Sequence, residues 1–377
     1  MMSNVAANGN RPIFILYLIY GFRIGGAERH LLDLCKGLDR RRFRPEIIYF
    51  HRDEQMLDEF RQAGIPCSIF PAAAGELCCA EIYGLSRIIK KLSPDIVHVH
   101  LFHASRFGAM AAYIAGMKRI VRTKHNVSDP EARLGKKDRI WRTLYPLMLE
   151  RTVAVSKAIA REIDSPYVIY NGVDTDYFDS GAIDENYRKE CVKEFQVEGN
   201  PVIGIAARLT KQKGHTVLIR AFSQLLGDWP DARLLIAGDG EERSTLENLT
   251  GDLGLCERVS FLGSIRNVRE FLSILDLFVH PSLFEGLGIA VIEAMSMGLP
   301  IVASKVDGLA ELISDGVEGL LVEPGNPGEL CQAMNRILGN SALGAKLGSQ
   351  ARTKAVDQFS LKTMVQKYQE LYVDMCR

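Results

Sequence analysis

The chain has 377 residues, 47% of them apolar, and its 46 basic side chains balance 46 acidic ones. This composition is typical of an ordinary globular protein, and the length favours two domains over one. Residues 12–22 hold only about ten apolar positions, too few to cross a bilayer, so we expect no membrane-spanning segment. The eight cysteines are dispersed, which favours reduced thiols in a cytoplasmic protein.

The charge is divided unevenly along the chain. Residues 1–180 hold 26 Lys and Arg against 20 Asp and Glu, and the remainder holds 20 against 26. A basic N-terminal half is compatible with an anionic partner or a membrane surface, although scattered solvated charges explain it equally well. We expect no nucleic-acid partner.

Two successive series of short apolar strands alternate with helical segments, which is the pattern of parallel α/β sheets. The first predicted series comprises Ile13–Leu18, Pro45–Phe50, Ile96–Val99, Ile120–Thr123, Thr152–Val155 and Tyr167–Tyr170. The second predicted series comprises Val202–Ala207, Arg233–Ala237, Val259–Leu262, Leu277–His280, Ile301–Ser304 and Leu320–Val322. The sequence therefore predicts two Rossmann-like parallel-sheet domains.

The predicted domain boundary lies in the segment that links the two series of strands. A polar, acidic stretch runs from residue 171 to about residue 199 and suits a hinge followed by a lead-in helix. We predict an N-terminal domain over 1–178, a C-terminal domain over 179–358 and a terminal helix over 359–377. Ligands of such sheets bind beyond the carboxyl ends of the strands, so two facing domains would enclose an interdomain cleft.

A glycine-containing turn follows the first predicted strand. Gly25 and Gly26 open a predicted helix over 27–37 and allow a phosphate to approach the backbone closely. The spacing in residues 21–28 is not G-x-G-x-x-G, so a dinucleotide oxidoreductase loses its main support. A generic strand-to-helix turn would explain the same two glycines.

Three histidines, His98, His100 and His103, form an H-x-H-x2-H pattern at a predicted strand end. Zinc is conceivable there, but the sequence identifies no further ligand, so polar residues at a strand end are the favoured interpretation. The D-x-D string at residues 174–176 binds a divalent metal in some transferases, yet here it falls at the predicted hinge and suits a turn. We expect no metal and no cofactor.

Residues 133–147 interleave five basic side chains with Trp, Tyr and aliphatic residues. This pattern is compatible with peripheral contact to a membrane surface. A helix that packs its apolar face on its own sheet and leaves Lys and Arg in water is at least as good an explanation.

Two cations follow the first strand of the second series. Arg208 and Lys213 fall near the carboxyl end of that strand, where they could neutralise a departing diphosphate. An exposed basic loop is the alternative interpretation.

Two glutamates lie eight residues apart around a predicted helix start. Glu285 falls on a loop and Glu293 on a predicted helix over 289–297. The intervening Gly286, Leu287 and Gly288 would present backbone N–H groups and the positive end of the helix dipole to a diphosphate. A carboxylate beside them can accept hydroxyl protons, so the pattern points to a sugar nucleotide, although a plain strand-turn-helix unit with a solvated Glu285 also fits.

These motifs together resemble the group 1 glycosyltransferases, the retaining enzymes of family four, which combine an E-x7-E motif with the two-domain GT-B fold. The resemblance covers almost the whole chain, because it includes Gly25-Gly26, residues 171–174, the R-x4-K-G pattern at Arg208 and residues 308–311. It implies that Glu285 contacts hydroxyls of the transferred sugar, that Glu293 contacts the ribose, and that Arg208 and Lys213 contact the diphosphate.

The same resemblance implies further contacts with the donor. Gly25 and Gly26 would approach the diphosphate from the N-terminal domain, and His125 would face the donor sugar. Gly238 and Ile265 would lie in loops that flank the nucleoside. The N-terminal domain would then bind the acceptor, the C-terminal domain would bind the nucleotide sugar, and the terminal helix would cross back to the N-terminal domain.

The implied function is retaining transfer of a hexose or N-acetylhexosamine from a nucleoside-diphosphate sugar to a hydroxyl of a glycan or lipid-linked acceptor. Uridine diphosphate is the expected nucleotide, with guanosine diphosphate left open, and the implied process is envelope polysaccharide or glycoconjugate synthesis in the cytoplasm or at the inner face of the cell membrane. A sugar-nucleotide epimerase and a catalytically silent sugar-nucleotide-binding scaffold are the alternatives. A P-loop phosphotransferase is disfavoured because no G-x4-G-K-[ST] string is present.

Overall fold

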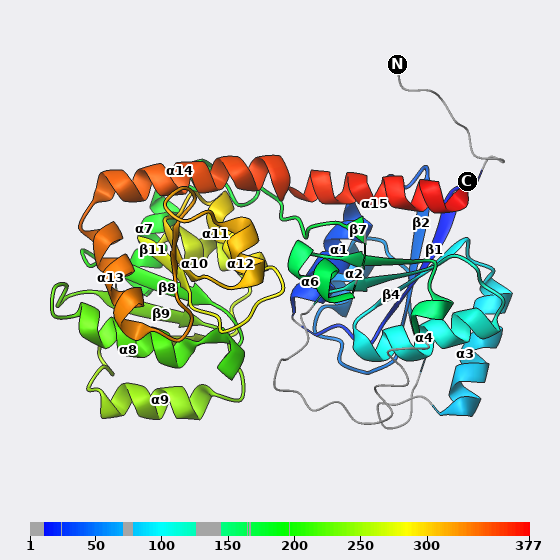
Figure 1. Cartoon of the computed structure of the whole chain (residues 1–377), viewed down its shortest axis with the longest axis horizontal. Helices are drawn as coiled ribbons and strands as arrows, with labels where there is room; N and C mark the ends of the chain where they lie inside the picture. The colour runs from blue at the N-terminus through cyan, green and yellow to red at the C-terminus, as the bar shows by residue number, and fades with distance from the viewer. Residues whose placement is uncertain are drawn as a thin grey trace, which may run out of the picture. The chain divides into compact units, whose positions relative to one another are not determined.

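The computed structural model describes residues 11–23, 25–70, 78–125, 145–163, 165, 167–195 and 197–377. Contacts between Cα atoms divide the chain into two compact units, shown in Figure 1. Unit 1 comprises Met1–Asn171 and Leu361–Arg377, and unit 2 comprises Gly172–Ser360. The predicted boundary follows residue 178, whereas this division falls between Asn171 and Gly172.

The sheet of unit 1 is fully parallel, with the strand order β3-β2-β1-β4-β5-β6-β7. Its strands are β1 Ile13–Ile19, β2 Phe43–Tyr49, β3 Cys67–Ile69, β4 Ile96–His100, β5 Ile120–Lys124, β6 Arg151–Ala154 and β7 Tyr167–Val168. The chain runs outward from β1 to β3 and then returns to β4 beside β1. The strand order therefore reverses between β1 and β4.

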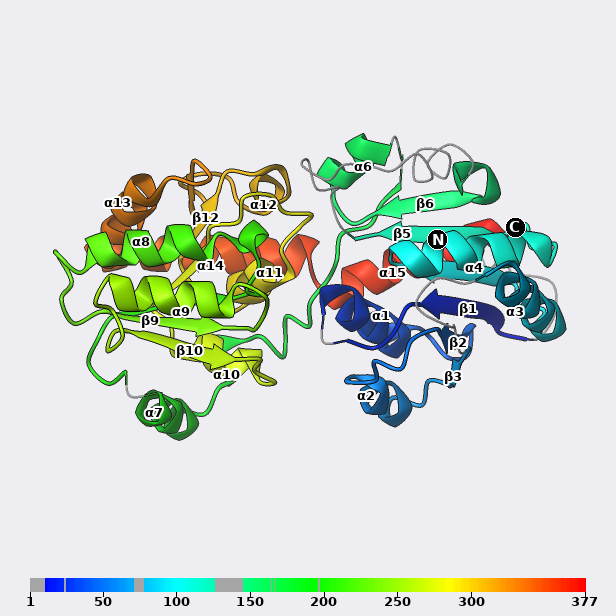
Figure 2. The same ribbon diagram turned by 90° about the horizontal axis from the view of Figure 1, so that it is seen from below.

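Alternate residues of β1 enter two different cores of unit 1. Ile15 and Tyr17 pack with α1, α2 and α15 on one face of the sheet, whereas Leu16 and Leu18 pack with α3 and α4 on the other face. Figure 2 shows α3 and α4 side by side. The helical elements of this unit are α1 Gly26–Gly37, α2 Leu57–Gln62, α3 Cys79–Leu92, α4 Phe102–Ile114, η2 Tyr145–Met148, α6 Lys157–Ile163 and α15 Leu361–Cys376.

Helix α15 is held on unit 1 by buried hydrogen bonds as well as by apolar packing. The hydroxyl of Tyr372 lies 2.7 Å from His98 Nδ1 and 3.0 Å from the hydroxyl of Tyr17. The hydroxyl of Tyr368 lies 3.0 Å from Thr123 Oγ1, which in turn lies 2.8 Å from His98 Nε2. The helix therefore shares one hydrogen-bonded network with β1, β4 and β5.

We expect Tyr372→Phe to lower the free energy of unfolding by about 1–3 kcal/mol, because His98 and Tyr17 would each lose a buried hydrogen-bond partner. Urea unfolding at neutral pH measures this loss. The control is Tyr83→Phe, since Tyr83 is 60% exposed on α3 and its replacement should change stability by less than about 0.5 kcal/mol. Equal stabilities of the two variants would contradict a structural role for the network.

The sheet of unit 2 is also fully parallel, with the strand order β10-β9-β8-β11-β12-β13. Its strands are β8 Val202–Ala206, β9 Arg233–Ala237, β10 Val259–Gly263, β11 Leu277–His280, β12 Ile301–Ser304 and β13 Leu320–Val322. All six strands were predicted, and β9, β11, β12 and β13 have the predicted bounds. Here the strand order reverses between β8 and β11.

Unit 2 buries one face of its sheet under α8, α9 and α13. Ile203 and Ile205 of β8 share an apolar core with Leu218, Leu246 and Met334 of these helices. Figure 2 shows α8 and α9 alongside β9. The helical elements are η3 Ser180–Ala182, α7 Glu185–Glu194, η4 Lys211–Lys213, α8 His215–Leu225, α9 Arg243–Asp252, α10 Val268–Ser273, α11 Ile289–Ser296, α12 Asp307–Leu312, α13 Pro327–Leu338 and α14 Ser341–Gln358.

Two sequence predictions concern membranes. Among the described residues, no helix is both long enough and apolar enough to span a bilayer. The segment 133–147, for which membrane contact and a helix packed on the sheet were both left open, lies outside the described residues except for its last three positions, which belong to η2. Of these, Leu147 is 77% exposed.

Candidate active site

The loops that follow β8 and β11 meet at the carboxyl edge of unit 2, where the strand order reverses. In open parallel sheets this point is where the connections run to opposite sides and leave a crevice for ligands. Arg208 is exposed on the loop after β8, and Lys213 follows in η4. Glu285 lies on the loop after β11.

Glu285 is only 9% exposed, and its carboxylate is tied to several donors. Its Oε2 accepts hydrogen bonds from the ammonium group of Lys213, from Ser282 Oγ at 3.3 Å and from His280 Nε2 at 3.1 Å. Its Oε1 accepts one from the backbone N–H of Gly286 at 3.2 Å. The structure thus joins two of the predicted catalytic residues, Lys213 and Glu285, in a largely buried ion pair.

The surroundings of Glu285 keep it ionised. Burial by itself raises the pKa of this carboxyl, but the charge of Lys213 and the hydrogen bond from His280 outweigh burial, so the pKa lies well below its usual range. Burial lowers the pKa of His280, a change that the nearby carboxylate partly offsets. We therefore assign His280 as neutral, with its proton on Nε2, and Glu285 as a carboxylate that can accept hydrogen bonds but cannot act as an acid.

Two hydrogen bonds to main-chain carbonyl groups join the two loops. Leu283 N–H donates to the carbonyl of Gln212 at 2.8 Å, and Gln212 Nε2 donates to the carbonyl of Phe284 at 2.9 Å. Gly214 has a φ of +68°, and a Cβ there would lie 2.0 Å from the carbonyl oxygen of Pro281. Glycine at position 214 is therefore needed both for its backbone conformation and for the close approach that brings Lys213 to Glu285.

The other residues of unit 2 that are predicted to bind the nucleotide sugar lie on the same edge of the sheet or on α11. Gly286 and Leu287 are buried, and Gly288, with a φ of +92°, immediately precedes α11. Glu293 is a partly buried residue of α11. Gly238 follows β9 and Ile265 follows β10, where Ile265 is partly exposed.

His215 lies at the start of α8, directly after this loop, and is 2% exposed. Burial, and then the nearby His280 and Lys213, lower its pKa to about 3. Since this folded-state pKa lies below the unfolded value of about 6.5, the unfolded chain takes up the proton first, and stability is lost as the pH falls through that interval.

We expect protonation of His215 in the unfolded chain to lower the free energy of unfolding by about 2 kcal/mol as the pH falls from 7 to 5. Urea unfolding of the intact protein and of His215→Gln at both pH values isolates the effect, because the variant should lose about 2 kcal/mol less over that interval. His51→Gln, which removes an exposed histidine, is the control. An identical pH dependence in the intact protein and His215→Gln would contradict this assignment.

In unit 1, the turn at Gly25 and Gly26 follows β1, and His125, a predicted contact of the sugar donor, follows β5. Both lie near the point where the strand order reverses between β1 and β4. Gly25 precedes α1 in an extended conformation, with a φ of −165°, and Gly26 is the exposed first residue of that helix. A Cβ at Gly25 would lie 2.7 Å from the carboxylate of Glu28. His125 directly follows β5 and is partly exposed.

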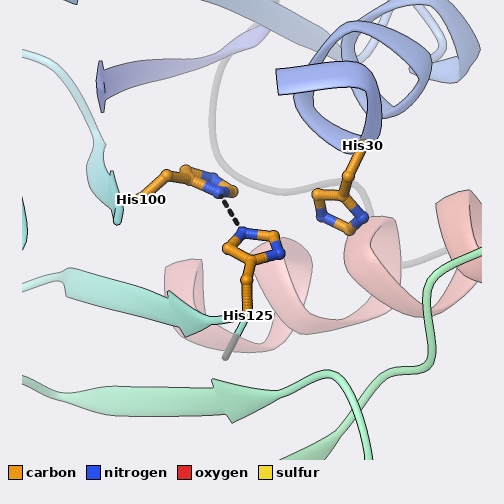
Figure 3. Close-up of side chains that lie close together, drawn as sticks. All are labelled: His30, His100 and His125. Carbon is orange, nitrogen blue, oxygen red and sulfur yellow. Dashed lines mark hydrogen bonds between the residues drawn. The ribbon is translucent and has the colours of Figure 1, made fainter. Parts of the chain in front are cut away.

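The histidines of unit 1 are grouped differently from the H-x-H-x2-H pattern. His98 is fully buried and hydrogen-bonded at both ring nitrogens, so it is an internal residue of the α15 network rather than a strand-end surface residue. The side chain of His103 lies outside the described residues. Instead, His100 Nδ1 lies 3.1 Å from His125 Nε2, and His30 of α1 completes a cluster with them (Figure 3).

The D-x-D string forms a turn in unit 2. Asp174 Oδ1 accepts hydrogen bonds from the backbone N–H groups of Asp176 at 3.2 Å and Tyr177 at 3.0 Å. Thr175 between the two acids is buried, whereas both acids are exposed. Asp174 therefore stabilises the chain direction at this point, in agreement with the interpretation as a turn.

Sequence reasoning missed three residues of these sites: His30, His280 and Ser282. His280 ends a predicted strand five residues before Glu285, so its place at a strand end was the available signal. His30 falls beside Leu31 on the buried side of α1, and a histidine at an apolar helix position is the signal that could have identified it.

The sequence matches two family models, Glycosyltransferase Family 4 over residues 24–177 and Glycosyl transferases group 1 over residues 187–354. It is 28% identical to an Escherichia coli UDP-Gal:alpha-D-GlcNAc-diphosphoundecaprenol alpha-1,3-galactosyltransferase, over 78% of this chain and 79% of that protein. It is 26% identical to the N-acetyl-alpha-D-glucosaminyl L-malate synthase of Bacillus anthracis, over 88% of this chain and 85% of that protein.

The structure is similar to that of Anabaena HepE, which was solved in complex with UDP and glucose. The TM-score is 0.87 at 26% identity, and the match covers 96% of this chain and all of the other. The protein belongs to the group 1 glycosyltransferases of family four, and its two parallel-sheet units form a GT-B fold. It is an enzyme that transfers sugars from nucleotide sugars.

Proposed function

We propose that the protein is a retaining glycosyltransferase that moves a hexose or N-acetylhexosamine from a UDP-sugar to a hydroxyl of a glycan or lipid-linked acceptor. The observation that carries this proposal is the buried, ionised Glu285, paired with Lys213 at the strand-order reversal of unit 2. This arrangement supplies an acceptor for sugar hydroxyls and a cation for a diphosphate in one place.

The two carboxylate oxygens of Glu285 differ in how many further hydrogen bonds they can accept. Oε2 already accepts from Lys213, His280 and Ser282, whereas Oε1 accepts only from the adjacent Gly286 N–H among the described donors. A carboxylate oxygen has about two lone-pair directions. Oε1 is therefore the atom we assign to a hydroxyl of the transferred sugar.

The diphosphate would be held by charge and by backbone dipoles. Lys213 has three ammonium protons, so its bond to Glu285 leaves donors for a phosphate oxygen. Arg208 would add a planar donor fork. In the loop 286–288, the N–H groups of Leu287 and Gly288 would add donors at the start of α11, since that of Gly286 donates to Glu285. Glu293 is proposed for the ribose.

The remaining donor contacts are proposed by resemblance to the family. Gly238 and Ile265 would flank the nucleoside, Gly25 and Gly26 would approach the diphosphate, and His125 would hydrogen-bond the donor sugar. Burial lowers the pKa of His125, which makes its neutral ring a weak base, so its hydrogen bond to His100 would serve to orient the ring toward a sugar hydroxyl rather than to support general base catalysis.

Retention would follow from attack on the same face of the sugar from which the diphosphate leaves. The bond from the anomeric carbon to the phosphate oxygen breaks, the acceptor oxygen bonds to that carbon, and the departing phosphate oxygen takes the acceptor proton. Lys213 and Arg208 would stabilise the charge that develops on the phosphate. No metal takes part in this proposed scheme.

The choice of donor and acceptor is supported by the relatives. HepE was solved in complex with UDP and glucose. The Escherichia coli enzyme is named for a UDP-Gal donor and a diphosphoundecaprenol acceptor. We therefore propose a UDP-sugar and a lipid-linked or glycan hydroxyl, with synthesis of envelope polysaccharide or glycoconjugate at the cytoplasmic membrane face. Peripheral contact through 133–147 belongs to this proposal, and absence of cosedimentation with anionic liposomes at low salt would count against it.

Thermal shift and donor hydrolysis against a panel of nucleoside-diphosphate sugars test the proposal, with the intact protein compared to Glu285→Gln. We expect one UDP-sugar to stabilise the protein and to be slowly hydrolysed, and hydrolysis to fall at least tenfold in the variant. Proton NMR of the released sugar, recorded before mutarotation, reports retention. Donor binding without any hydrolysis or transfer would favour a silent scaffold, and a product that is still a nucleotide sugar would favour an epimerase.

A further inference from the structure

Three histidines from three different elements of unit 1 converge on one point. His30 comes from α1, His100 ends β4 and His125 follows β5, and Figure 3 shows their rings turned toward one another. One nitrogen from each ring lies within 4.8 Å of the other two. We propose that this cluster is a binding site for a divalent zinc ion, with His30, His100 and His125 as the protein ligands.

Among the described residues, His100 Nδ1 and His125 Nε2 pair only with each other, and the other ring nitrogens of this cluster have no hydrogen-bond partner. Within the described residues, His100 Nε2, His125 Nδ1 and both nitrogens of His30 are buried without a hydrogen-bond partner. The amide of Asn171 lies near His30, but the geometry falls short of a hydrogen bond, and its Oδ1 is also unpartnered. Buried polar atoms without partners are rare, and an ion bound beside the His100–His125 pair would give one to His30, which has none at either nitrogen among the described residues.

The spacing is close to what zinc requires. Tetrahedral zinc with Zn–N bonds of about 2.0–2.1 Å places its nitrogen ligands about 3.3 Å apart. His100 Nδ1 and His125 Nε2 are already 3.1 Å apart. His30 would have to approach by up to about 1.5 Å, the difference between the 4.8 Å limit and the tetrahedral spacing, which a side-chain rotation can supply.

The ligand set selects the class of metal. Imidazole nitrogens suit zinc and its first-row neighbours, whereas magnesium and calcium prefer oxygen ligands. His30 and His100 are 2% and 0% exposed, so these two ligands are shielded from water, while His125 is partly exposed. Three protein ligands leave a fourth position for water or another small ligand.

In the sequence, zinc is conceivable for His98, His100 and His103, whereas the structure gives a different set of histidines. His98 is excluded as a ligand because both of its ring nitrogens are hydrogen-bonded to Tyr372 and Thr123. A bound ion would engage His125, so occupancy would oppose the sugar contact proposed for that residue. This inhibitory consequence rests on the proposed function, whereas metal binding itself does not and can be tested without any donor.

The test uses the full chain without an affinity tag, stripped with EDTA and transferred to chelator-free buffer. Addition of Co2+ should produce the visible absorption bands of a four-coordinate ion, and Zn2+ should bleach them at one equivalent and raise the thermal midpoint. The variants His30→Gln, His100→Gln and His125→Gln should each lower the affinity for Zn2+ at least tenfold. Mutation of a residue that only hydrogen-bonds to a metal ligand already costs about tenfold or more.

The control is His51→Gln, because His51 belongs to the same unit but is exposed and stacks on Tyr20, away from the cluster. It should bind Zn2+ as the intact protein does. His30→Gln should fold normally because the described residues give its ring no hydrogen bond to lose, and thermal unfolding in EDTA checks this. The proposal is overturned if the intact protein shows no cobalt bands, or if the folded His30→Gln and the intact protein have the same zinc affinity.

Discussion

Lys213→Ala is expected to lower the rate of sugar transfer by about 10²–10³-fold, the cost of removing one preorganised donor from a developing charge. Lys213 is also the cation that compensates the buried carboxylate of Glu285. Its loss should therefore reduce stability by about 3 kcal/mol, because one partner of a buried pair is left charged. The matched control is Lys211→Ala, which removes an exposed lysine from the same turn.

A double variant separates the structural role of this pair from its chemical role. Lys213→Met together with Glu285→Gln removes both charges and should recover most of the stability that Lys213→Met alone loses. Transfer should remain low in both proteins, since both lack the cation and the double variant also lacks the carboxylate. Transfer within threefold of the intact rate in Lys213→Ala would show that the pair only holds the two loops together.

The strands of both sheets could be predicted because parallel strands buried on both faces are short apolar runs between turn residues. The sequence analysis missed β3, Cys67–Ile69, for a physical reason. This strand has three residues at the edge of the sheet, two of them exposed, so it carries neither an apolar run nor an alternating pattern. Strand order was likewise not available from the sequence, because it depends on which strands pair across the sheet.

Short local patterns in the sequence identified candidate site residues, but not which of them lie together when distant segments meet. Lys213 and Glu285 were each assigned from their own loops, yet their pairing joins residues 72 positions apart and required the docking of the two loops. The predicted role of Lys213 toward a diphosphate did not include the carboxylate beside it. His30 was missed because its position next to His125 depends on how α1 packs on the sheet, which no local spacing encodes.

Gly214→Ala is expected to lower the free energy of unfolding by at least about 3 kcal/mol and to reduce transfer at least tenfold. Two costs combine at this position. The φ of +68° is unfavourable for alanine by about 1–2 kcal/mol. The added Cβ would also lie 2.0 Å from the carbonyl oxygen of Pro281, so the two loops must separate. Separation would break the Leu283–Gln212 hydrogen bond and move Lys213 away from Glu285.

Gly254→Ala distinguishes these two costs. Gly254 has nearly the same backbone conformation as Gly214, but a Cβ at position 254 makes no close contact. Gly254 lies in the same unit with a φ of +69°, and a Cβ there would meet nothing within 4 Å. The control should therefore lose only about 1–2 kcal/mol, the penalty of the backbone conformation alone, and should retain full transfer. Urea unfolding and a donor hydrolysis assay on both variants measure the difference. Equal losses in the two variants would mean that the loops tolerate separation, and that the contact at Gly214 does not position Lys213 against Glu285.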